Sequence, residues 1–151
     1  MRIDLHNALP HLLGKAHKSI RSVMADELNK RGLDINAAAL PILGKLILSG
    51  GALPQSELVP LLEVDRHRVS RMVKDLQALE IIDVEANPKN KRENILVFTP
   101  KGHTTLELID STAQCVMELA YQGISKEARE ITEQTLKQIT NNLNPENYEV
   151  G

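Results

Sequence analysis

Residues 54–102 read PQSELVPLLEVDRHRVSRMVKDLQALEIIDVEANPKNKRENILVFTPKG, and this stretch decides the fold. Its apolar residues recur every three or four positions, first over 58–62 and then over 64–79, which is typical of two amphipathic helices. Around 82–86 and 94–99 the pattern changes to that of two β-strands, and the turn-forming stretch NPKNKRE lies between them. A short helix, a tight link, a second helix and a hairpin, in that order, indicate a winged helix-turn-helix.

The second helix and the hairpin both carry excess positive charge. Residues 65–75 hold four Lys or Arg against two Asp, and residues 87–101 hold four against one Glu. Asp65 precedes the first turn and is predicted to cap the helix. Basic residues on one side of a helix are usually only a solvated face. Here, however, the two basic stretches fall on the two elements that a winged helix presents to DNA, which favours duplex DNA binding.

Three segments of this stretch resemble those of a known family. QSELVPLLEVDRHRVSRMVKDLQALEII, NPKNKR and LVFTPKG are together similar to the MarR family of winged-helix transcriptional regulators, over about residues 33–110. The resemblance implies a mainly α fold with a small two- to three-stranded β-wing. It places a winged helix-turn-helix DNA-binding domain at 33–102, flanked by N- and C-terminal dimerisation helices at 1–32 and 103–151.

The resemblance also implies a homodimer, and physical reasoning gives that dimer a consequence. A two-fold dimer places two recognition helices about one turn of DNA apart, roughly 34–36 Å, on a pseudo-palindromic site. The alternative is a monomer whose terminal helices pack on its own core. For transcription, the family implies a repressor that a small ligand releases from DNA.

The expected DNA contacts follow from residue chemistry and from the family pattern. Arginine is the usual bidentate reader of guanine, whereas Lys74, further along the helix, is expected to meet a phosphate. Arg92 is the candidate for the minor groove by its match to the family's wing pattern. The predicted set is Gln55 and Ser56 before the first motif helix, Arg66, His67, Arg68, Ser70, Arg71 and Lys74 on the recognition helix, and Lys89, Asn90, Lys91 and Arg92 on the wing.

Four residues depart from the pattern and predict altered local geometry. Glu80 stands where the family usually has the glycine that ends a helix in the left-handed conformation. Asn90 replaces an aspartate that would pair with Arg92, although an amide can still accept a hydrogen bond from it. Pro60 falls inside the first motif helix and predicts a short or distorted helix, and Pro41 raises the same question one helix earlier.

Four further helices are expected outside the motif, over about 5–31, 35–48, 100–122 and 125–143. Thr99 and Ser125 are predicted N-caps, Pro100 is predicted at the first helical position, and Gly123 is expected to break the chain between the last two helices. Aromatic residues are only three, so the core is expected to be aliphatic. Scarce aromatics also argue against single-stranded nucleic-acid binding, and a net charge of −2 argues against indiscriminate DNA coating.

Other functions are less well supported. Lys15, His17, Lys18 and Arg21 cluster on the first helix and could attract the small anionic or phenolic ligand of the family, although a solvated face is the commoner meaning. Cys115, the single cysteine, could be a redox switch, but its apolar neighbours and the lack of a resolving partner favour a buried, inert thiol. One thiol without a secretion signal predicts a cytoplasmic location without a membrane partner. No metal-ligand spacing, cofactor motif or catalytic motif is present. The alternative function is a winged-helix protein–protein interaction module that has lost DNA binding.

Overall fold

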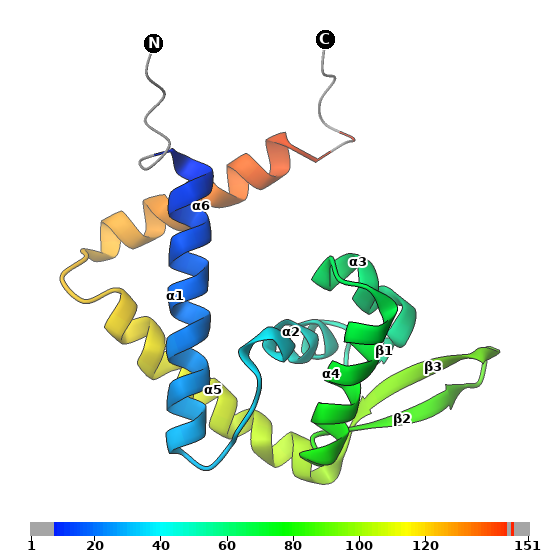
Figure 1. Ribbon diagram of the computed structural model, residues 1–151. Helices are drawn as coiled ribbons and strands as arrows, with labels where there is room; N and C mark the ends of the chain where they lie inside the picture. Colours follow the sequence, from blue (N-terminus) through cyan, green and yellow to red (C-terminus); the bar gives the residue numbers. More distant parts are fainter. Residues whose placement is uncertain (1–7, 145, 147–151) are drawn as a thin grey trace. The chain divides into compact units, whose positions relative to one another are not determined.

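The computed structural model describes residues 8–144 and 146, which divide into two compact units between Val116 and Met117. The first unit contains the motif predicted above (Figure 1). In chain order its elements are α1 (Leu9–Lys30), the 3-10 helix η1 (Ala37–Ala39), α2 (Leu40–Leu48), β1 (Ala52–Pro54), the 3-10 helix η2 (Gln55–Glu57), α3 (Leu58–Leu62), α4 (Arg66–Ala78), β2 (Ile82–Asn87), β3 (Asn90–Phe98) and the greater part of α5 (Pro100–Ala120). This confirms the predicted fold class.

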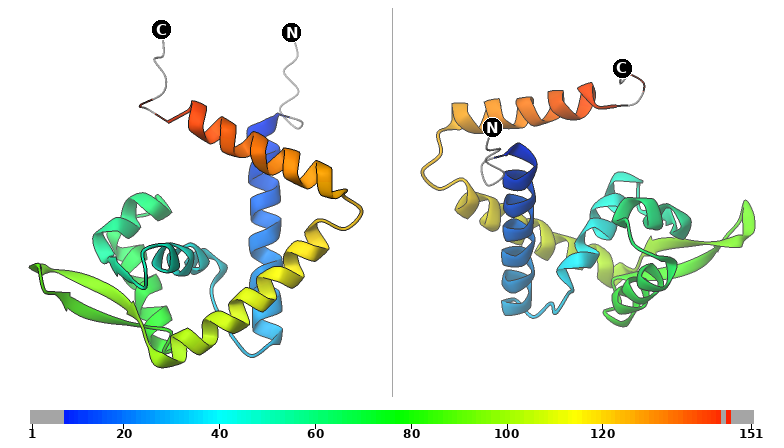
Figure 2. Two further views of the ribbon diagram at one scale, coloured as in Figure 1. Left: turned by 180° about the vertical axis from the view of Figure 1, so that it is seen from behind. Right: turned by 45° about the horizontal axis from the view of Figure 1, so that its top comes forward.

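The wing is a three-stranded antiparallel sheet in the order β1-β3-β2. Ile82 faces Phe98 at the base of the hairpin, and the register shifts between Ala86 and Asn87 near its tip. Figure 2 shows that the hairpin of β2 and β3 projects away from α2, α3 and α4. The short strand β1 pairs with β3 through Ala52 and Val97, which ties the start of the motif to its wing.

The core of the first unit is aliphatic, as the composition predicts. The recognition helix α4 contributes Val69, Met72, Val73 and Leu76, and the other elements contribute Leu28, Ile42, Leu43, Leu46, Leu53, Leu58, Ile81, Ile82, Leu96 and Val116, among others. Among the described residues, one polar side chain is buried with them. The Thr112 hydroxyl donates to the Leu108 carbonyl at 2.6 Å and accepts from the Arg31 guanidinium at 3.1 Å, which joins α1 to α5.

Glu80 adopts the left-handed conformation that its position demands. With φ at 58°, it follows α4 as a glycine would. The Ile81 N–H donates to the Leu76 carbonyl at 3.1 Å and the Glu80 N–H donates to the Gln77 carbonyl at 2.8 Å. These two bonds make a Schellman motif, so the helix ends as it would with a glycine at this position, but with a residue that is strained there. The Glu80 carboxylate pairs with the Lys101 ammonium at 2.5 Å.

The two prolines have different outcomes. Pro41 lies in the first turn of α2, where its missing N–H needs no partner, so it does not distort that helix. Pro60 lies inside α3, which has only five residues and follows a 3-10 turn, so this helix is short, as predicted. The expectation of a single helix over 35–48 was wrong. Asn36 accepts from the Ala38 N–H at 2.9 Å and starts a 3-10 turn, and α2 begins only at Leu40.

The predicted ends of the outer helices are largely confirmed. Helix α1 begins at Leu9, and its expected start at about residue 5 falls within residues 1–7, which lie outside the described residues. The Thr99 hydroxyl accepts from the Gly102 N–H at 2.8 Å at the start of α5. In the second unit, Gly123 takes a φ of 77° and Ser125 caps α6 (Lys126–Asn142) by accepting from the Ala128 N–H at 3.1 Å.

Candidate nucleic-acid interface

The start of the recognition helix α4 is fixed by the side chain of its N-cap residue, Asp65. Asp65 accepts from the backbone N–H of Arg68 at 2.9 Å, so the helical turns start at Arg66. This backbone hydrogen bond is the main reason that the pKa of Asp65 is lowered, with His67 and the Arg68 charge adding to it. The carboxylate satisfies a backbone donor of the first turn, and the basic side chains begin immediately after it.

The basic side chains of α4 spread over three sides of the helix. With 3.6 residues per turn, the face opposite the buried residues holds His67, Arg71 and Lys74, which are all exposed. Arg66 lies on the side that faces the wing, and the half-buried Ser70 lies between it and the exposed stripe. Arg68 lies on the far side, toward Asp75. The residues most directly presented to solvent are therefore His67, Arg71 and Lys74.

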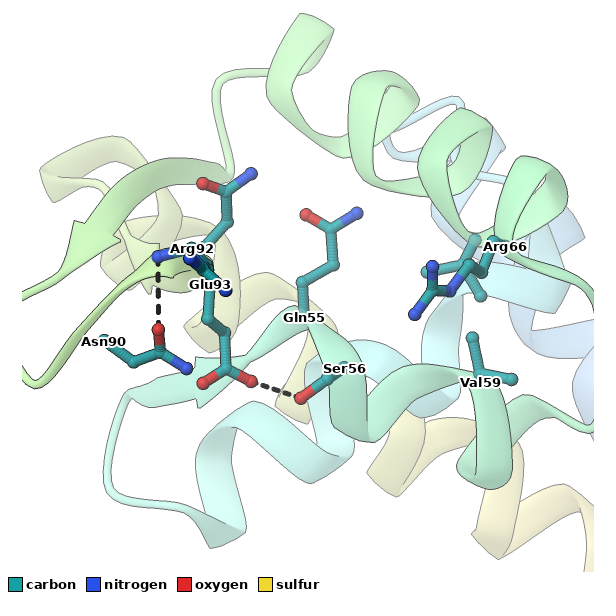
Figure 3. A pocket seen from close by; sticks show the side chains of 9 residues that line it. Gln55, Ser56, Val59, Arg66, Asn90, Arg92 and Glu93 are labelled. Atoms are coloured by element: carbon teal, nitrogen blue, oxygen red, sulfur yellow. Dashed lines mark hydrogen bonds between the residues drawn. The ribbon is translucent and has the colours of Figure 1, made fainter.

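Five of the predicted residues line one cavity of about 360 Å³ (Figure 3). They come from three elements that are distant in the sequence. Gln55 and Ser56 come from η2, Arg66 from the first turn of α4, and Asn90 and Arg92 from the wing. Val59, Val69, Glu93 and Asn94 complete the lining. The structure thus brings part of the predicted set together in a groove between the wing and the two motif helices.

Amide side chains fix the tip of the wing. The Asn90 amide oxygen accepts from the backbone N–H of Arg92 at 3.2 Å, a bond that Figure 3 marks, and Asn87 accepts from the backbone N–H of Lys89 at 2.9 Å. Asn90 therefore bonds the main chain of Arg92, and no bond from it to the guanidinium is recorded among the described residues. Lys89, Lys91 and Arg92 are all exposed at this tip.

Glu93 is a member of the cavity that the sequence analysis missed. It is half-buried, and its carboxylate accepts a close hydrogen bond from the Ser56 hydroxyl (Figure 3) and another from the Asn87 amide at 3.2 Å. In the sequence it counts only as the single acid among four basic residues. Its partner Ser56 is far from it in the chain, so charge counting had no means of identifying the contact.

Other predicted residues of α4 line a second cavity, of about 440 Å³, on the far side of the helix. It is formed by three basic residues together with two acidic ones, namely His67, Arg68, Arg71, Asp65 and Asp75, and by Asn36 and Met72. Because acids alternate with bases here, the net positive charge of this hollow is smaller than the arginines alone suggest. The recognition helix is therefore flanked by a hollow on each side.

The candidate ligand residues lie elsewhere. On α1, Lys15, His17 and Lys18 are exposed and Arg21 is half-buried, and the two cavities described above are lined by other residues. The expectation of a buried cysteine was wrong, because Cys115 is exposed on α5, where Thr112 and Val116 take the inward positions instead. Within the described part of the chain, no three His, Cys, Asp or Glu residues gather as a metal site, and no helix is long and apolar enough to span a membrane.

Comparisons with known proteins agree with this fold. The model of the MarR family matches residues 26–93, and no curated protein sequence matches the chain. Apo MarR from E. coli is 21% identical with a TM-score of 0.75, and the likeness covers 87% of this chain and 96% of that one. A mutant E. coli MarR complexed with operator DNA is 22% identical with a TM-score of 0.74, covering 91% and 99%.

A third solved structure adds a regulated relative. BpsR from Bordetella bronchiseptica, whose DNA binding is regulated by 6-hydroxynicotinic acid, is 19% identical with a TM-score of 0.72, and the likeness covers 93% of this chain and 98% of that one. At these identities the three likenesses show a shared fold over nearly the whole chain.

Proposed function

We propose that the chain, whose residues 26–93 match the model of the MarR family, is a transcriptional regulator of that family that binds duplex DNA as a homodimer and acts as a repressor. The observation that carries the proposal is the groove between wing and recognition helix. Its lining combines the Arg66 and Arg92 side chains with the polar side chains of Gln55 and Ser56. Two cations and several hydrogen-bond donors on one concave surface suit the phosphate backbone of DNA.

The proposed roles follow from position. His67, Arg71 and Lys74 form the exposed stripe of α4, which would enter the major groove, and Arg71 lies near its middle. Arg66, Gln55 and Ser56 would hold the adjacent phosphates and fix the register of the helix. Lys89, Lys91 and Arg92 would extend the contact along the wing, with Arg92 as the minor-groove residue, where its guanidinium would meet a phosphate that borders the groove.

Exposed apolar side chains support the homodimer. Large hydrophobic residues that a folded monomer would normally cover remain exposed on α1 and in the second unit, namely Leu9, Leu12, Leu13 and Ile20 on the first and Leu119, Ile124, Ile131 and Leu143 in the second. A second copy of the chain would bury such surfaces and place two recognition helices about one DNA turn apart. Sedimentation equilibrium would detect the dimer directly.

Repression and its release by a ligand rest on the family and on one relative. Because 6-hydroxynicotinic acid regulates the DNA binding of BpsR, we expect a small anionic or phenolic ligand here too. Lys15, His17, Lys18 and Arg21 on α1 are the candidate contacts, since four basic side chains within two helical turns attract an anion.

Fluorescence anisotropy with duplex DNA from around the protein's own gene, at several salt concentrations, tests the proposal. Wild type is compared with Arg71→Ala, Arg92→Ala and the control Lys137→Ala, an exposed residue of α6. We expect Arg71→Ala to relax sequence preference, at about 1–3 kcal/mol per lost base contact. Arg92→Ala is expected to weaken all sequences and to reduce the salt slope by about 0.9 if it loses one phosphate.

Lys137→Ala should behave as wild type, which separates local contacts from a change in net charge. Binding that never exceeds the nonspecific level of roughly 10⁻⁴–10⁻⁶ M on any fragment, including a genome-wide selection, would refute the proposal.

A further inference from the structure

We propose that Glu93 is an internal competitor for the DNA phosphate, which lowers the affinity for duplex DNA until Ser56 exchanges the Glu93 carboxylate for a phosphate oxygen. The inference rests on the proposed DNA binding and adds a residue that controls its strength. It starts from the observation that a carboxylate lies in the groove formed by Arg66, Arg92, Gln55 and Ser56.

The contacts of Glu93 show what it occupies. One carboxylate oxygen accepts from the Ser56 hydroxyl and the other accepts from the Asn87 amide at 3.2 Å. A serine hydroxyl has a single hydrogen to donate. While Ser56 donates to Glu93, it therefore cannot donate to a phosphate, and one of the three side chains proposed to fix the register on DNA is already engaged.

The charges around Glu93 show why the groove still favours a phosphate. Within residues 8–144 and 146, the ion pairs closer than 4 Å are Lys30–Glu27, Lys101–Glu80 and Lys126–Glu130, so neither arginine of the groove is neutralised by Glu93 at that distance. Arg66 and Arg92 are both exposed and remain able to meet an anion from outside. A phosphate that enters the groove is attracted by the side chains of Arg66 and Arg92 but is repelled by the Glu93 carboxylate beside Ser56.

The geometry of the wing makes the exchange feasible. Glu93 is half-buried rather than enclosed, and it lies on β3 next to the exposed Asn94. After exchange, the Asn87 amide remains as a donor for the displaced carboxylate, so the carboxylate keeps a hydrogen-bond partner. The displaced carboxylate still repels the bound phosphate. This repulsion lowers the affinity for DNA of every sequence alike, because the phosphate backbone does not depend on sequence.

The test compares Glu93→Gln with wild type for binding to a duplex without an operator, over a range of salt concentrations. Glutamine keeps the shape and an acceptor oxygen for Ser56 but removes the charge. We expect affinity at low salt to rise roughly two- to fivefold, the range for a partly exposed charge interaction. The salt slope should steepen by up to about 0.9, as if one more phosphate were neutralised.

Three variants make this result specific. Glu85→Gln removes the same charge from an exposed position of the same hairpin that does not line the groove, and it should bind as wild type does. Ser56→Ala removes the exchanging hydroxyl, and in that background Glu93→Gln should bring a smaller gain than it brings in wild type, because only the repulsion between Glu93 and the phosphate is left to relieve. Thermal unfolding checks that Glu93→Gln is folded. If it is not, Glu93→Ala, which has neither the charge nor an acceptor oxygen, replaces it and should show the same gain in affinity.

The outcomes separate the two proposals. If wild type binds DNA but Glu93→Gln binds no better than Glu85→Gln, the competitor is refuted and DNA binding stands. If Glu93→Gln raises affinity as much in the Ser56→Ala protein as in wild type, Glu93 acts only by repelling the phosphate through space. That result would refute the exchange at Ser56. If wild type and every Glu93 variant fail to bind any duplex, the proposed function itself falls, and this inference falls with it.

Discussion

Replacing Gly102 by alanine tests the junction that positions the wing against α5. A Cβ at this buried position would lie 2.0 Å from the carbonyl oxygen of Ile81, 2.9 Å from its carbonyl carbon and 3.2 Å from the Thr99 hydroxyl. The Ile81 carbonyl is fixed, because it accepts from the Thr99 backbone N–H at 3.1 Å. Since ordinary contacts are about 3.5–4.0 Å, the start of α5 and the start of β2 must separate by more than an ångström.

The cost of that separation sets the expected magnitude. Overpacking a rigid site costs about 1–3 kcal/mol, and here the upper part of the range applies because the atoms in the way are backbone. For a chain of this size each kcal/mol lowers Tm by roughly 2–4 °C, so a cost of about 2–3 kcal/mol in Gly102→Ala should lower Tm by about 4–12 °C. The measurement is thermal unfolding followed by circular dichroism, at a fixed protein concentration because oligomerisation alters Tm.

Gly44→Ala is the matched control, because it makes the same substitution on an exposed position inside α2, where a Cβ meets nothing within 4 Å. That variant should gain about 0.5–1 kcal/mol, as alanine does over glycine inside a helix. A Gly102→Ala protein as stable as wild type would refute the reasoning, since it would show that the wing and α5 are not in contact at this point.

Two further predictions concern the ends of α4. Glu80→Gly should raise Tm, because relief of the left-handed strain at Glu80 outweighs the loss of an exposed ion pair with Lys101. Glu80→Ala keeps the strain and loses the ion pair, so it should lower Tm. Equal Tm values for the two variants would contradict this reasoning. Asp65→Ala should lower Tm at neutral pH. Because the pKa of Asp65 is lowered by folding, its stabilisation is complete above the unfolded-state pKa and is lost as pH falls through the folded-state pKa. The difference in Tm between the variant and wild type should therefore disappear in acid. A difference in Tm that does not change with pH would refute this linkage.

Local signals were sufficient to predict most of the motif. The α4 helix was predictable because its apolar period, the Asp65 cap and its basic face all lie within one short stretch. The start of α5 was predictable for the same reason, since Thr99 and Pro100 are adjacent and each has a known role at a helix start. Where one segment carries its own evidence, sequence reasoning succeeded.

The features that were missed depend on partners distant in the chain. Strand β1 has three residues, ends in Pro54 and exists only because β3 pairs with it. Glu93 gains its meaning from Ser56, which approaches only after η2 and the wing have been brought together. The inward or outward side of α5 at Cys115 is set by what packs against that helix, and apolar neighbours in sequence did not reveal it.

The pairing of β1 with β3 has a consequence for folding and synthesis. Ala52 reaches Val97 only across a long intervening loop that contains α3, α4 and β2. Closing such a loop costs entropy that local hairpin formation does not, so β2 and β3 should pair early and β1 should join late. A chain still emerging from the ribosome therefore carries a basic helix before it has a groove. The proposed phosphate site between η2 and the wing is complete only when β3 has been made and has paired with β1.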